Sequence, residues 1–149
     1  MTSVLLSVKP RFAEKILSGE KTCEFRRGQF PLDIQEVFVY SSSPEKRVVA
    51  MFRVKNVHTM KPREAWEKYN GRGGIDRNSF FSYYRTSDEA VCIEIGAVFE
   101  FKPRIDPRRL YRGFVAPQSF AYVSEPMRRK LDGRGVKKWR RRLGGAPTH

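Results

Sequence analysis

The stretch KPRFAEKILSGEKTCEFRR, residues 9–27, decides the fold expected for this chain. A short apolar segment at residues 4–8 leads into Pro10, whose fixed φ suits the first turn of a helix. Apolar residues then recur on one helical stripe as far as Gly19, a residue type that commonly ends helices. Beyond the turn the period changes to two, so the pattern predicts a strand at residues 22–26.

This predicted strand has one apolar face and one charged face. Cys23 and Phe25 share the apolar face, whereas Glu24 and Arg26 share the other. Lys21 lies in the turn, one step before the charged face begins. We therefore expect Lys21, Glu24 and Arg26 to converge at the mouth of a small fold, and we take them as the candidate site.

The same residues resemble a family signature. Gly19, Lys21, Glu24 and Arg26 spell G-x-K-x-x-E-x-R, which is similar to the signature of the ASCH domain, a branch of the PUA-like β-barrels. Four further segments also resemble small prokaryotic and viral ASCH proteins: LLSVKP at 5–10, YSSSP at 40–44, CIEIG at 92–96 and APQSFAYVS at 116–124. The resemblance covers residues 4–124, with these segments in the expected order.

Charge is the unusual feature of the composition. The chain has 149 residues, enough for one domain, and its 40% apolar content is ordinary for a globular protein. It carries 30 Lys and Arg against 16 Asp and Glu, a net charge of +14. Such an excess favours a polyanionic partner, nucleic acid first and an anionic membrane surface second. The alternative is a solvated surface without a specific partner.

Cysteine usage and hydropathy indicate the cellular compartment. Cys23 and Cys92 are the only cysteines, and they have neither metal-binding spacing nor a disulfide framework. No apolar run approaches the ~20 residues of a membrane span, and the apolar segment at 4–8 is too short for a signal peptide. We therefore expect a cytoplasmic protein that does not enter a membrane.

Periodicity along the rest of the chain predicts a mixed fold. Further strands are expected at residues 36–40, 48–58, 90–101 and 118–123, and helices at 62–69 and 77–84, with one helical turn after Asp106. Gly96 interrupts the second long strand and suggests a bulge or a bend. The fold class expected is α+β, a small PUA-like mixed β-barrel of about six strands with two or three short helices.

Three local features are expected to be structural. The glycine-rich residues 71–74 are not followed by Gly-Lys-Ser/Thr, so we interpret them as a flexible surface connection rather than a phosphate loop. The aromatic stripe at residues 80–84 is expected in the core. Glu94 lies between Ile93 and Ile95, so it faces away from the core and is treated as structural.

The composition changes near the C-terminus, which predicts an ASCH domain at 1–124 and a basic tail at 125–149. Residues 128–142 contain nine basic residues and one acidic residue, a net charge of +8. Trp139, inside KKWRRR, offers a ring that can stack on a base. We interpret the tail as a nucleic-acid-binding arm; the alternative is a charged tail that aids solubility.

Several classes of catalyst are poorly supported. His58 and His149 are the only histidines, and the chain has no H-E-x-x-H, G-x-S-x-G or paired C-x-x-C motif. We therefore expect no metal and no cofactor. Lys21 and Arg26 can instead bind phosphate beside Glu24, or Lys21 can act as a base with Glu24 as its partner in proton transfer. A purely structural Glu24–Arg26 ion pair is the third alternative.

The resemblance implies three activities. PUA-like domains commonly bind RNA or modified bases, and some ASCH-type relatives are amidohydrolases that remove the acetyl group of N4-acetylcytidine with a Thr nucleophile at the position of Glu24. Because this chain has a carboxylate at that position and not a hydroxyl, we rank deacetylation below nucleic-acid binding. Ribonuclease activity is also associated with ASCH proteins, and for such cleavage Lys21, Tyr40 and Ser119 would supply a base, a phosphate contact and a proton relay.

Our prediction is a nucleic-acid-binding protein that favours RNA or single strands, with a metal-independent ribonuclease as the alternative and an amidohydrolase third. If the chain is an enzyme, Lys21 and Glu24 are the expected catalytic residues. The residues expected to bind nucleic acid are Lys9, Lys21, Glu24, Arg26, Tyr40, Ser42, Ser43, Gln118, Ser119, Lys137, Lys138, Trp139, Arg140 and Arg141.

Overall fold

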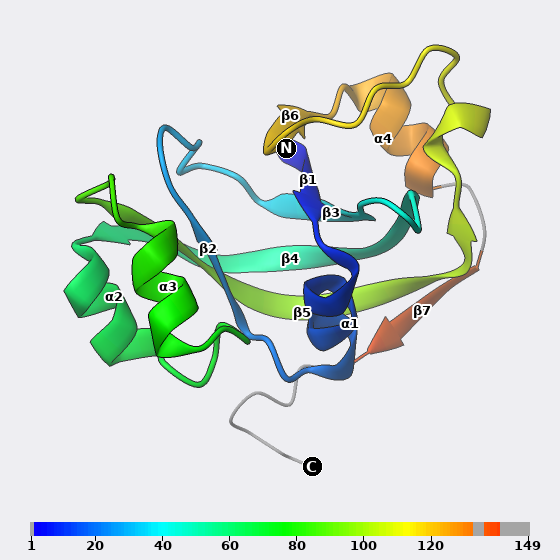
Figure 1. The fold of residues 1–149 in the computed structure, drawn as a ribbon. Coiled ribbons are helices and arrows are strands. Elements are labelled where there is room, and N and C mark those ends of the chain that lie inside the picture. Colours follow the sequence, from blue (N-terminus) through cyan, green and yellow to red (C-terminus); the bar gives the residue numbers. More distant parts are fainter. Residues whose placement is uncertain (1, 133–135, 141–149) are drawn as a thin grey trace.

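One strongly curved sheet organises the chain (Figure 1). The structure is a computed structural model that describes residues 2–132 and 136–140, the latter as backbone only. The elements are β1 (Ser3–Val8), α1 (Pro10–Ser18), β2 (Cys23–Arg26), β3 (Glu36–Ser41), β4 (Arg47–Met60), α2 (Pro62–Tyr69), α3 (Arg77–Tyr83), β5 (Ala90–Ile105), the 3₁₀ turn η1 (Pro107–Arg109), β6 (Phe120–Tyr122), α4 (Glu125–Asp132) and β7 (Val136–Arg140). The strand order is β2-β5-β4-β3-β1-β6, and β7 pairs with β5.

The first helix is placed by the pairing of β1 with β3. These two strands run parallel, so the chain between them must cross back along the sheet, and α1 lies in that connection. Pro10 begins α1, and Gly19 ends it with a φ of 88°. Ala13, Ile16 and Leu17 face the sheet and are buried, as the helical stripe predicts.

The curvature of the sheet comes from its two long strands, β4 and β5. Their pairing shifts register at three places, between Val48 and Ala50 and twice more between Phe52 and Asn56. Gly96 on β5 passes so close to β4 that a Cβ there would stand 3.0 Å from the carbonyl oxygen of Arg53. The register shift between Phe52 and Val54 lies opposite Gly96, so the bulge that the glycine suggested is confirmed, and the sheet curls into a half-barrel.

The sheet is covered on both faces, and this creates three apolar clusters. The first contains the inward residues of the sheet, such as Val39 and Ile93, under α1. The second lies on the opposite face and includes Phe38, Phe101 and Leu131 of α4. The third, under α2 and α3, contains Phe25, Cys92, Tyr69, Phe80 and Tyr84, which confirms the predicted core role of the aromatic stripe.

The predicted α+β class and mixed barrel are confirmed, with two differences. The described part of the chain has four α-helices rather than two or three, because α4 falls in the segment that we interpreted as tail. The sixth strand, β6, covers only Phe120–Tyr122. No helix of the described residues is long and apolar enough to cross a membrane.

A buried ion pair attaches α4 to the sheet. Arg128 donates from Nε to Glu36 Oε1 at 2.7 Å and from Nη2 to Oε2 at 3.0 Å, and Ser3 Oγ donates to the same carboxylate at 2.9 Å. Burial would raise the pKa of Glu36, but the hydrogen bonds and the charge of Arg128 outweigh it and hold this pKa below its usual range. The domain boundary after residue 124 remains a prediction, yet residues 125–132 pack against the sheet.

Replacing Arg128 with Met should destabilise the fold by up to about 3 kcal/mol, because it leaves the Glu36 carboxylate buried without its partner. Denaturant unfolding measures this, with Arg129→Met as the matched control, since Arg129 is exposed and among the described residues pairs with Glu125 alone, at 3.8 Å. The lowered pKa of Glu36 gives stability that is present above its unfolded-state pKa and lost as pH falls through its folded-state pKa. The free energies of unfolding of the wild type and of Arg128→Met should therefore converge as the pH falls. Equal free energies near neutral pH would contradict the role assigned to Arg128.

Candidate functional site

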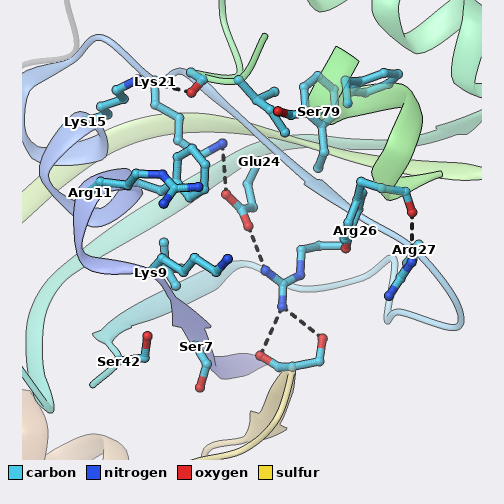
Figure 2. Close-up of a pocket in the computed structure, with 18 of the residues that line it drawn as sticks. Ser7, Lys9, Arg11, Lys15, Lys21, Glu24, Arg26, Arg27, Ser42 and Ser79 are labelled. Carbon is cyan, nitrogen blue, oxygen red and sulfur yellow. Dashed lines mark hydrogen bonds and ion pairs between the residues drawn. The ribbon is translucent and has the colours of Figure 1, made fainter. Parts of the chain in front are cut away.

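A cleft of about 1320 Å³ opens beside the N-terminal half of the chain (Figure 2). We call it the cleft. Its walls are α1, β2, the loop at residues 71–75, α3, and the segment 116–119 that precedes β6. These segments are far apart in the sequence, so the curl of the sheet assembles the cleft.

The bottom of the cleft holds a carboxylate between two cations. Glu24 Oε1 lies 3.1 Å from Lys21 Nζ, and Glu24 Oε2 lies 2.8 Å from Arg26 Nη1 (Figure 2). Burial would raise the pKa of Glu24, but the charges and hydrogen bonds of Lys21 and Arg26 outweigh it, so this pKa lies below its usual range. The predicted convergence of the three side chains is thus what the geometry shows.

The ammonium of Lys21 has no free donor. It contacts Glu24 Oε1, donates to the carbonyl oxygen of Cys23 at 3.0 Å and donates to that of Gly73 at 2.6 Å. These three acceptors match the three N–H donors of an ammonium. The side chain is only 5% exposed. In this arrangement Lys21 holds two backbone segments together.

The glycine-rich loop is part of the site, which corrects the interpretation as a mere surface connection. Gly73 is buried, and a Cβ at this position would lie 2.2 Å from Cε2 of Phe25. Its carbonyl accepts from Lys21, and the carbonyl of Gly74 accepts from Lys15 at 3.2 Å. The loop forms one wall of the cleft because glycine alone can approach the Phe25 ring this closely.

Arg26 also joins the two edges of the sheet. Its Nη2 donates to Ser119 Oγ at 3.0 Å and to the Ser119 carbonyl at 3.3 Å. Ser119 directly precedes β6, whereas Arg26 ends β2, and these are the two terminal strands in the order of the half-barrel. We call the gap between β2 and β6 the seam. Side chains therefore close the seam where backbone pairing does not.

The rim of the cleft carries further cations, which are not paired with Glu24 at the bottom. Arg11 stacks on Phe12 with its Cζ 4.6 Å from the ring centroid, and Arg27 stacks on Tyr83 at the same distance. Lys9 is exposed and has no acidic partner among the described residues. Figure 2 shows Lys9 and Arg11 on one side of Glu24 and Arg27 on the other. We refer to Lys9, Arg11 and Arg27 as the rim cations.

The structure brings together seven of the nine predicted site residues whose side chains it describes. The predicted residues that line the cleft are Lys9, Lys21, Glu24, Arg26, Ser42, Gln118 and Ser119. Tyr40 and Ser43 are not among the lining residues, and the buried ring of Tyr40 packs in the second cluster, 5.5 Å from the ring of Phe114. The expected combination of Lys21, Tyr40 and Ser119 is therefore not assembled in one place.

The tail residues stay predictions. Arg141 lies outside the described residues, and for Lys137, Lys138, Trp139 and Arg140 only the backbone of β7 is described, paired with residues 98–101 of β5. Within the described chain, no group of three His, Cys, Asp or Glu side chains is placed to hold a metal ion.

Sequence reasoning missed the α3 side of the cleft. Asn78, Ser79 and Tyr83 line it, yet the pattern of α3 indicated only which face packs inward. Nothing local in the sequence shows that α3 packs beside β2, where the Tyr84 hydroxyl donates to the Arg26 carbonyl at 2.7 Å. The stacked pair of Arg27 and Tyr83 depends on that long-range packing.

Glu94 is buried, which corrects the expectation that it faces away from the core. It faces α2, where Tyr69 Oη donates to Glu94 Oε2 at 2.6 Å, and Asn56 Nδ2 donates to Oε1 at 3.0 Å. Burial would raise the pKa of Glu94, but these hydrogen bonds outweigh it and lower the pKa. The pair with Tyr69 fixes the end of α2 from which the glycine-rich loop departs.

Comparison with known proteins identifies relatives for most of the chain. Residues 6–103 match the model of the ASCH domain. An ASCH domain-containing ribonuclease of Zymomonas mobilis is 24% identical over 131 residues, covering 85% of this chain and 88% of the relative. A crystal structure of ASCH from Zymomonas mobilis aligns with a TM-score of 0.84 at 22% identity, covering 90% of this chain and 96% of that one. A variant of that protein aligns with a TM-score of 0.82 at 20% identity, covering 91% of this chain and all of that one.

Replacing Lys21 with Met should destabilise the fold by about 3 kcal/mol, because Glu24 loses a buried partner and two buried carbonyls lose a donor. Lys15→Met is the matched control, since Lys15 is 35% exposed and donates to one carbonyl only, and it should cost less than about 1 kcal/mol. Chemical unfolding of both variants measures the difference. Similar losses in the two would show that the buried contacts of Lys21 do not support the fold.

Proposed function

The chain belongs to the ASCH domain family, and from this premise we propose that it is a ribonuclease that binds single-stranded RNA in the cleft. The observation that carries the proposal is the charge of the cleft: at its bottom two cations share one carboxylate, and its rim adds further cations. The Zymomonas mobilis relative named a ribonuclease supports cleavage over binding alone.

The arrangement of charge suits a phosphate backbone that crosses the mouth of the cleft. Glu24 is bonded at both oxygens, so it does not repel an incoming phosphate as a free carboxylate would. The rim cations lie on opposite walls and can each contact a phosphate. Aromatic rings under the two guanidiniums favour unpaired bases, which can stack where paired bases cannot.

Ser119 is the hydroxyl best placed to assist cleavage. Arg26 donates to Ser119 Oγ, so the serine hydroxyl proton is left to be donated to a phosphate oxygen. Cleavage without a metal uses the ribose 2′-hydroxyl as nucleophile: its oxygen gives a proton to water and bonds to phosphorus, the bond to the 5′-oxygen breaks, and the 5′-oxygen takes a proton from water. The rim cations and Ser119 would stabilise the negative charge that develops on the phosphate.

Two alternatives follow from the same cleft. Binding without cleavage is the reading that the sequence alone favours, and it needs only the rim cations. An amidohydrolase with a nucleophile at position 24 fits less well, because both oxygens of Glu24 are bonded to cations.

We also propose that the basic residues at 137–142 add affinity that does not depend on base sequence.

Cleavage of a single-stranded RNA should persist with a chelator present and should stop when one 2′-hydroxyl is replaced by hydrogen at the cleaved position. The product should carry a 2′,3′-cyclic phosphate, because the 2′-oxygen is the nucleophile. Mass spectrometry of the products checks both points. Loss of activity with the chelator, or cleavage of the deoxy position, would rule out this route; intact RNA that is nevertheless bound would leave the binding alternative.

Ser119→Ala should lower the cleavage rate by about a hundredfold, as loss of one charge-stabilising donor does, while RNA affinity changes little. Ser43→Ala is the matched control, because Ser43 is an exposed hydroxyl near the cleft that does not line it. Single-turnover rates compare the two variants. If Ser43→Ala slows cleavage as much as Ser119→Ala does, the assignment of Ser119 is wrong.

A further inference from the structure

A second hollow lies next to the cleft. It has a volume of about 660 Å³, and we call it the side hollow. Its walls are the loop at residues 28–32, residues 87–89, and Phe120 and Tyr122 of β6. Nothing in the proposed cleavage uses these residues.

The side hollow continues the cleft along the seam. Arg26 and Arg27 line the cleft, and the next residue, Gly28, lines the side hollow. On the other edge Ser119 lines the cleft, and Phe120 lines the side hollow. Because these lining residues are consecutive in the chain on both edges, the two hollows adjoin along the seam.

Aromatic rings run from the core to the surface in the side hollow. Phe30, 9% exposed, packs edge-on against Phe120 with centroids 4.8 Å apart, and Phe120 packs against Tyr122 at 5.8 Å. Tyr122 is 64% exposed, and Leu32 beside this row is 56% exposed. Such an exposed ring on an apolar support is a stacking surface for a base.

The charge of the side hollow is opposite to that of the rim. Asp88 and Glu89 line it, whereas no Lys or Arg of the described residues does. A phosphate is repelled from this place and stays with Arg27. A carboxylate does, however, accept hydrogen bonds from the amino groups of adenine, cytosine and guanine, while uracil has no amino group to donate.

We propose that the side hollow binds one base of the RNA strand held in the cleft, and that it selects a base with an amino group over uracil. The base stacks on Tyr122 and donates to Asp88 or Glu89, and its phosphate contacts Arg27. This inference rests on the proposed function, since the strand must first be held in the cleft.

Equilibrium binding of labelled, non-cleavable 2′-fluoro oligonucleotides of about eight nucleotides tests the inference. We expect the adenine and cytosine homopolymers to bind about tenfold more tightly than the uracil homopolymer. Tyr122→Ala should weaken binding of the first two about tenfold and leave uracil binding nearly unchanged. The double variant Asp88→Ala with Glu89→Ala should remove the preference.

Two controls separate this inference from the proposed function. Tyr111→Ala removes a ring that is 58% exposed and lines neither hollow, so it should change nothing. Lys9→Gln should weaken all three oligonucleotides about equally, and Lys61→Gln, at the equivalent Lys-Pro start of α2, should not.

The outcomes are then distinct. Failure to bind any of the oligonucleotides, or binding that is indifferent to Lys9→Gln, overturns the proposed function. Binding that depends on Lys9 but shows no base preference and no effect of Tyr122→Ala overturns the side hollow alone. A cationic peptide that binds wild type and not Tyr122→Ala, with no base preference, would assign the side hollow to a protein ligand and likewise overturn the inference.

Discussion

The buried carboxylate of Glu24 is the constraint around which the N-terminal half of the molecule is arranged. It links Lys21 on one side and Arg26 on the other. Through these cations it connects the glycine-rich loop, the turn after α1, β2 and the segment before β6. Buried ion pairs add little net stability, because desolvation offsets their attraction. What this chain of contacts determines is which segments meet, since any other arrangement leaves a charge buried without a partner.

That constraint also separates structural charge from charge available to a ligand. The bottom of the cleft has the residues of the family signature, yet the ammonium of Lys21 and the two terminal nitrogens of Arg26 donate within the protein. The rim cations come from positions outside the signature, and two of them, Arg11 and Arg27, are held by aromatic rings instead of carboxylates. The signature residues thus shape the cleft, while neighbouring residues supply the charge that faces solvent.

Local periodicity was enough to predict most of the elements and the meeting of Lys21, Glu24 and Arg26, because a strand places alternate residues on one face. It could not place Tyr40. All six residues of β3 are buried, since α1 covers one face of the sheet and the second cluster covers the other, so alternation does not show which face borders the cleft. The role of Gly73 and the packing of α3 beside β2 were also beyond prediction, because both depend on contacts between segments about fifty residues apart.

The contact between Gly73 and Phe25 has a consequence for how such sequences diverge. A side chain at position 73 needs the space that the Phe25 ring occupies, so the two positions cannot change independently. A descendant with alanine at position 73 must also have an apolar residue smaller than Phe at position 25. Whichever substitution comes first, the intermediate is poorly packed. Paired substitution at these two distant positions is therefore the pattern that evolution of this loop should leave in an alignment of close relatives.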